Sequence, residues 1–380
     1  MIHFRSPVKR AGAERYQLIT LISFAASVVL TRIYLELTGF PQIGNGVLHI
    51  AHVLWGGLLL FVAALLPILI ANRWVYKLSA LLSGIGVGLF IDEVGKFITR
   101  TNDYFFPFAA PIIYAFFMIT VTVYIQVRRP SKHDSRAELY HALDEIMELI
   151  ENDLDANERT GLEARLRRII AEASYPEHAR LAEALLAVID SDTLEVVNHA
   201  PNLLERLAKR LEAVEKQILT EARYRWLLVI GLTVAGIGSL IEVIVYALAI
   251  ISPDVLNSLV VTLLGDNRVT GPMSLVWFVI LIVLTGLVGA MLLAGGALMF
   301  IRRRKAGSEI GYLGVIVQLT TVCLLLFYFN QFAAVGTTLW AFALLVGLTR
   351  YRLIYLGIGS QINVLSNLAD KTTAQFALDE

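Results

Sequence analysis

The stretch LSGIGVGLFIDEVGKFI, residues 82–98, joins an apolar, glycine-rich half to a half that carries Asp92, Glu93 and Lys96. These three residues fall within about one turn of a helix. A charged side chain at the centre of a membrane-spanning helix costs about 2.5–3.5 kcal/mol on insertion scales. The charges must therefore face protein or water, and the stretch predicts a membrane-spanning helix with a charged site near one end.

The whole chain has the composition of a membrane protein. Hydrophobic residues make up 57% of the 380 residues and charged residues 17%, whereas soluble domains are about one-quarter charged. A helix needs about 20 apolar residues to cross a bilayer, and eight runs approach or exceed that length: 16–34, 47–70, 75–99, 108–127, 224–251, 273–301, 310–329 and 333–348. The sequence thus predicts an all-α, polytopic membrane protein with eight transmembrane helices. Only residues 330–332 separate the last two runs, which form either a tight hairpin or a buried pair that does not cross fully.

The distribution of Lys and Arg predicts the orientation. Short loops rich in these residues stay in the cytoplasm. With the N-terminus in the cytoplasm, the cytoplasmic span ends hold sixteen Lys and Arg, and the outer side holds four: Arg32, Lys96, Arg100 and Arg268. We therefore predict a multi-pass protein of the plasma (inner) membrane with both termini cytoplasmic. The basic residues flank apolar runs, which indicates lipid headgroups rather than nucleic acid as their partners.

The segment between the fourth and fifth spans is acidic. Residues 131–222 contain 20 Asp and Glu against 11 Lys and Arg. Helical periodicity predicts helices at 136–154, 158–173 and 176–189, and a fourth that runs from Pro201 unbroken into the fifth span. The predicted organisation is spans one to four in 1–130, a cytoplasmic helical domain in 131–222, spans five to eight in 223–352 and a cytoplasmic tail in 353–380.

The two sets of four spans show faint internal similarity. The residues Glu14-Arg15-Tyr16 open the first set and Ala222-Arg223-Tyr224 open the second. Four is an even number, so a duplication would give two halves of the same orientation, a 4+4 parallel repeat.

The charged end of the third span is the first candidate site. Gly84, Gly88, Asp92 and Lys96 share one helix face, so the charges continue a stripe where another helix can approach closely. Lys96 is four residues from Asp92 and three from Glu93 and can neutralise only one of them well. The other carboxylate needs a more distant partner or a proton, so we expect at least one raised pKa.

Other polar residues fall at the same predicted depth and could surround one cavity open to the outside: Arg32, His49, His52, Glu242, Asn330 and Gln331. A purely structural interpretation pairs Asp92 with Lys96, and Glu93 or Glu242 with Arg32. His49, His52 and Glu93 also have the donor types of a divalent-metal site. No motif in the sequence requires a cofactor. These residues are compatible with one bound divalent metal ion.

Buried carboxylates favour a transporter or channel for protons or a small cation. Two alternatives stay open. One is a metal-dependent membrane enzyme with an outward-facing site. The other is a sensor or assembly protein that binds a cytoplasmic partner through residues 131–222, and a homo-oligomer is compatible with each.

The topology can be tested with reporter fusions. Reporters placed after Arg73, within residues 131–222, after Lys305 and after Arg352 should report cytoplasm, because each position follows a basic span end. Reporters near Gln42, Asn102 and Asn267 should report the outside. A cytoplasmic signal at Asn102 would overturn the predicted order of the first four spans.

Overall fold

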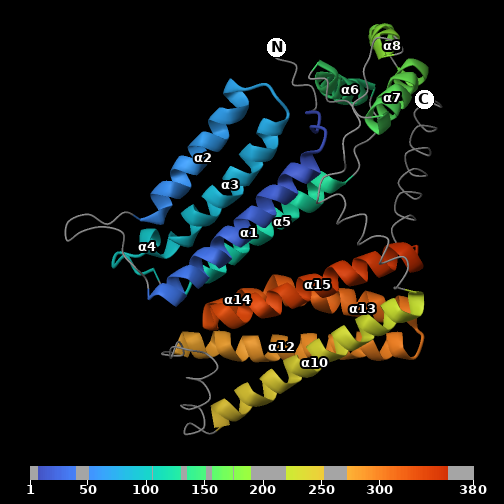
Figure 1. Cartoon of the computed structure of the whole chain (residues 1–380). Coiled ribbons are helices and arrows are strands. Elements are labelled where there is room, and N and C mark those ends of the chain that lie inside the picture. The colour runs from blue at the N-terminus through green and yellow to red at the C-terminus, as the bar shows by residue number, and fades with distance from the viewer. Residues whose placement is uncertain are drawn as a thin grey trace, which may run out of the picture. The chain divides into compact units, whose positions relative to one another are not determined.

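The computed structural model describes residues 7–39, 51–104, 106–129, 135–150, 156–173, 175–189, 220–251 and 272–357, which form helices and turns without a strand among them (Figure 1). Eight helices are long and apolar enough to cross a membrane. The chain is a multi-pass helical membrane protein, as predicted. The spans are α1 (Ala13–Thr38), α2 (His52–Leu69), α3 (Trp74–Asp92), α5 (Ala109–Arg128), α10 (Glu221–Ile251), α12 (Pro272–Phe300), the continuous run α13 (Arg304–Val317), η1 (Gln318–Val322) and α14 (Cys323–Phe329), and α15 (Gln331–Tyr355).

Two span ends differ from the predicted ones. The third span stops at Asp92, and Glu93 separates it from the short helix α4 (Val94–Ile98). The eighth span runs on to Tyr355, and its 23-residue apolar part is long enough to cross, which favours the hairpin over a buried pair. The predicted helix upstream of the fifth span, 201–219, lies outside the described residues, as does the tail from residue 358.

The chain divides into two compact units. The first comprises Met1–Tyr104 and Phe116–Leu203, and the second comprises Phe105–Ala115 and Leu204–Glu380. In the first unit, α3 packs against both α1 and α2. In the second unit, α12 packs against α10 and α13. In the first unit α1 packs against α3, the third span of its set, whereas in the second unit α10 packs against α12, the second span of its set, so the packing does not support the 4+4 repeat.

Glycines on two faces of α3 allow both contacts. Gly84 and Gly88 face Ser23 and Ser27 of α1, and Gly86 faces Gly56 of α2. A Cβ atom added to Gly86 would lie 2.9 Å from the Gly56 carbonyl oxygen, closer than real Cβ atoms come. Small residues at such positions let membrane helices approach backbone to backbone. The glycine stripe predicted on the Gly84 face is therefore the α1 contact.

Hydroxyl groups add interhelical hydrogen bonds along these contacts. Ser27 donates to the Ile85 carbonyl at 3.1 Å, and Ser79 donates to the Ala63 carbonyl at 2.7 Å. Such bonds are worth about 0.6 kcal/mol on average in a membrane protein. They fix the rotation of α3 between its neighbours, which decides where its charged end points.

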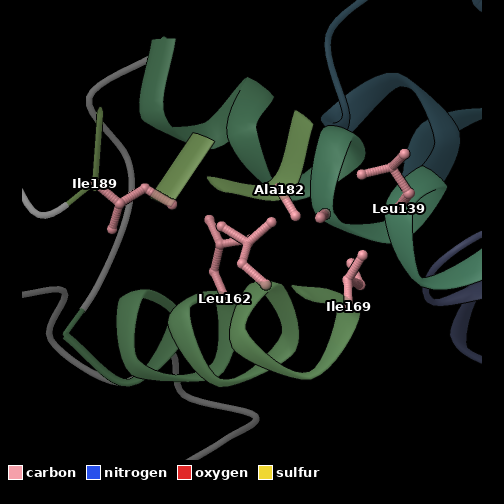
Figure 2. Packing of buried hydrophobic residues seen from close by; sticks show 7 residues of the cluster. Leu139, Leu162, Ile169, Ala182 and Ile189 are labelled. Atoms are coloured by element: carbon pink, nitrogen blue, oxygen red, sulfur yellow. The ribbon is translucent and has the colours of Figure 1, made fainter. Parts of the chain in front are cut away.

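The acidic middle segment forms three helices, α6 (Ser135–Ile150), α7 (Ala156–Glu172) and α8 (Pro176–Ile189), close to the predicted ranges. Apolar side chains from the three helices gather between them (Figure 2). Leu162, Leu166 and Ile189 are completely buried there. The helices thus have a hydrophobic core of their own.

The helical domain is also tied to one end of the first unit's spans. Asp144 of α6 lies 3.7 Å from Arg10, which precedes α1, and 3.9 Å from Arg73, which lies between α2 and α3. The ends that hold Arg10 and Arg73 are ends that the distribution of basic residues assigns to the cytoplasm. The acidic segment and these basic span ends therefore lie on one side of the first unit.

The close packing of α1 on α3 can be tested by adding one methyl group at Gly84. A Cβ atom at Gly84 would overlap Ser23 Oγ and the Thr20 carbonyl oxygen, whereas nothing lies within 4 Å of a Cβ atom at Gly57. We expect Gly84→Ala to lower the free energy of unfolding by about 1–3 kcal/mol. Gly57→Ala should leave it unchanged or higher, because alanine favours helix over glycine by about 1 kcal/mol. Unfolding in mixed micelles checks both, and equal effects would contradict the packing.

Candidate functional site

The ends of three helices converge in the first unit and bring charged residues together. Arg32 lies near the end of α1, His52 is the first residue of α2, and Asp92 is the last residue of α3. Asp92 continues the face of Gly84 and Gly88, which packs on α1, so its carboxylate reaches Arg32. Three of the predicted site residues, Arg32, His52 and Asp92, thus lie in contact within this unit.

The Asp92 carboxylate is completely buried and well partnered. Its Oδ1 accepts a hydrogen bond from Arg32 Nε at 2.6 Å, and its Oδ2 accepts one from the Tyr104 hydroxyl at 2.5 Å. Nε2 of His52 lies 3.2 Å from the same Oδ2. A buried carboxylate in a membrane is tolerated when positive and hydrogen-bonding groups surround it. Asp92 meets that condition through residues of three other segments.

Glu93 is also completely buried but is held differently. It occupies the break between α3 and α4, with φ −88° and ψ 9°, in the bridge region where active-site residues often sit. His52 Nδ1 lies 2.9 Å from Oε1, and Lys96 Nζ lies 3.4 Å from Oε2. These are ion-pair distances, but among the described residues neither oxygen has a partner with hydrogen-bond geometry. Glu93 therefore has charge partners but unused hydrogen-bonding capacity.

His52 bridges the two carboxylates through its two ring nitrogens. Its Nε2 likewise has no aligned hydrogen-bond partner within the described part of the chain. Arg32 and Lys96 already balance the charges of Asp92 and Glu93. The cluster is therefore neutral when His52 is neutral and carries one positive charge when His52 is protonated.

Tyr104 completes the cluster and is not among the site residues predicted from the sequence. Its ring lies 5.7 Å from the Arg32 guanidinium and 5.3 Å from the Lys96 ammonium, within cation–π range. Burial and the Asp92 carboxylate raise the pKa of Tyr104 well above its usual value. The phenol keeps its proton and is a permanent donor to Asp92.

Two predictions about these charges are wrong. Lys96 pairs with Glu93, and Asp92 pairs with Arg32, whereas the structural interpretation of the sequence paired Asp92 with Lys96. The expected pKa rise is also reversed at Glu93. Burial raises the pKa of Glu93, but His52 and Lys96 outweigh burial and hold that pKa below its usual value. The prediction counted one nearby base, and folding supplies Arg32 and His52 as well.

The other predicted site residues that the structure describes lie in the second unit. Asn330 caps α15, its Oδ1 accepting a hydrogen bond from the Ala333 amide at 3.0 Å, and Glu242 lines a cavity described below. His49 lies outside the described residues. Among the described residues, no three His, Cys, Asp or Glu side chains are arranged to hold a metal ion. The predicted metal site of His49, His52 and Glu93 includes His49 and therefore stays a prediction.

Comparison of the chain with protein-family models, with curated proteins and with solved structures finds no match.

A double-mutant cycle tests the Arg32–Asp92 pair. Arg32→Gln should lower the free energy of unfolding by about 3–5 kcal/mol, because it leaves a buried carboxylate without its closest cation. Asp92→Asn in addition should restore part of that loss, giving a coupling energy of about 0.5–3 kcal/mol. Unfolding of the three variants in mixed micelles measures it. Strict additivity of the two single effects would show that the pair is not coupled.

Proposed function

We propose that this protein is a transporter or channel for protons or a small cation in the plasma membrane, and that His52 and Glu93 relay protons within it. The observation that carries the proposal is the buried Glu93 carboxylate. It stands at ion-pair distance from His52 and Lys96 while both its oxygens lack an aligned hydrogen-bond partner among the described residues.

The two carboxylates have different chemical capacities. Asp92 is held by Arg32 and Tyr104 in short hydrogen bonds and is suited to a fixed, ionised role. Glu93 can accept a hydrogen bond from water or from a protonated His52, or it can pair with a passing cation. Proton transfer from His52 Nδ1 to Glu93 Oε1, 2.9 Å apart, converts imidazolium and carboxylate into neutral imidazole and carboxylic acid. That step leaves the net charge of the cluster unchanged.

Exchange of a proton with water changes the cluster charge by one, and His52 is the group suited to it. Its ring presents one nitrogen to each carboxylate, so it can take up a proton at one nitrogen and release a proton from the other. The low pKa of Glu93 fits this division, because Glu93 then holds a proton only in passing. A cluster built only for packing would have no need of a titratable group between its two acids.

Flux measurements in liposomes test the proposal. Purified protein is reconstituted, a pH gradient or a sodium or potassium gradient is imposed, and internal pH and ion content are followed with dyes. We expect His52→Asn and Glu93→Gln to lower flux by about 100-fold or more, as loss of a proton-transfer group does. Asp103→Asn is the matched control, because Asp103 is an exposed acid eleven positions from Asp92 in the same unit and should leave flux unchanged.

Each variant is first checked for monodispersity and thermal stability in detergent. Absence of flux in the wild type under every gradient would overturn the proposal. So would wild-type flux in a folded His52→Asn variant.

A further inference from the structure

The second unit contains a cavity of about 310 Å³ between α10, α12, the η1–α14 segment and α15. Its volume lies at the lower end of the range for small-molecule sites, about 300–1,000 Å³. Aliphatic side chains make up much of the wall. The groups that could recognise a ligand are Glu242, Tyr246, Thr285, Gln318, Thr337 and Trp340.

Two of the lining polar side chains are buried without a partner. Gln318 is 4% exposed and Thr285 is 2% exposed. Gln318 Oε1 and Thr285 Oγ1 have no hydrogen-bond partner among the described residues. An unsatisfied buried polar atom costs about 1–3 kcal/mol, and two of them on one cavity wall indicate that the cavity holds something that hydrogen-bonds to them.

A local change of helix type presents Gln318 to the cavity. The seventh span changes from α- to π-helix at η1, where the Cys323 amide donates to the Gln318 carbonyl five residues earlier. Single π turns inside α-helices often mark functional sites. The Leu319 carbonyl within this turn accepts a hydrogen bond from the Tyr114 hydroxyl at 2.5 Å. The turn is thus supported by a specific hydrogen bond.

Glu242 determines the charge of the ligand. No Lys, Arg or His lies within ion-pair distance of Glu242 in the part of the chain that the structure describes. A carboxylate in a mostly apolar cavity excludes anions and favours a cation. The described residues offer no cluster of ligands for a metal ion, and the cavity is larger than one bare ion requires. The rings of Tyr246 and Trp340 instead suit a cation with an organic surface, which can lie against an aromatic face.

We propose that this cavity binds a compact organic cation, such as a small alkylammonium. Glu242 neutralises the charge, Trp340 and Tyr246 contact the alkyl groups, and Gln318 and Thr285 accept hydrogen bonds from N–H groups or from ordered water. The site is separate from the His52–Glu93 cluster, and binding to it does not depend on proton transfer by that cluster.

Binding is measured on the full-length protein in detergent, without a gradient. Tetramethylammonium and methylammonium are titrated at constant ionic strength, with melting temperature and equilibrium dialysis as readouts. We expect saturable binding and a concentration-dependent rise in melting temperature. Neutral tert-butanol, which has a similar shape, and sodium chloride at equal concentration should produce neither effect.

Variants identify the site. Glu242→Gln should weaken alkylammonium binding at least about tenfold, since it removes the charge, and Trp340→Leu should weaken it too. Glu309→Gln removes an exposed acid from the same unit and should bind as the wild type does. If Glu242→Gln does not fold, Trp340→Leu and Gln318→Leu decide the question.

No saturable binding of either alkylammonium would overturn the proposal. Binding unchanged in folded Glu242→Gln and Trp340→Leu would do the same, as would binding of sodium in place of the organic cations.

Discussion

The ion pair between Arg32 and Asp92 is the constraint on which the first unit depends. A carboxylate inside a membrane is not solvated by bulk water and needs a cation from the protein. Asp92 can reach Arg32 only because α3 lies close to α1, and Gly84 and Gly88 make that approach sterically feasible. The glycine stripe and the Arg32–Asp92 ion pair thus act together. The stripe sets the distance between the helices, and the ion pair sets their register at the charged end.

In the cavity of the second unit, buried polar groups lack the partners among the described residues that the acids of the first unit have. The first unit balances two acids with two permanent bases and one histidine, whereas the cavity of the second unit leaves Glu242 without a base among the described residues and leaves Gln318 and Thr285 unsatisfied. An internally balanced cluster suits movement of a proton, which can pass between existing groups. An unbalanced cavity suits a ligand that brings the missing charge. We therefore propose proton transfer at the cluster and binding of an organic cation in the cavity.

Much of this arrangement follows from local sequence, and the remainder depends on folding. The eight spans follow from the lengths of the apolar runs, and the face shared by Gly84, Gly88 and Asp92 follows from helical periodicity, so the sequence alone predicted both. The partner of Lys96 was predicted wrongly because the choice assumed an unbroken helix. In such a helix Lys96 lies one turn beyond Asp92, but the break at Glu93 turns it toward Glu93. The role of Tyr104 and the π turn at Gln318 depend on contacts between distant segments, and no local pattern reveals them.

The helix break at Glu93 also divides the cluster between two helical segments. Glu93 lies at the end of α3, which glycine contacts hold in place, and at the start of the five-residue α4, which carries Lys96. A shift of α4 would move Lys96 and alter the conformation at Glu93, while Asp92 kept its bonds to Arg32 and Tyr104. In the proposed relay, the distance between Glu93 and His52 would couple such a backbone movement to proton transfer between them.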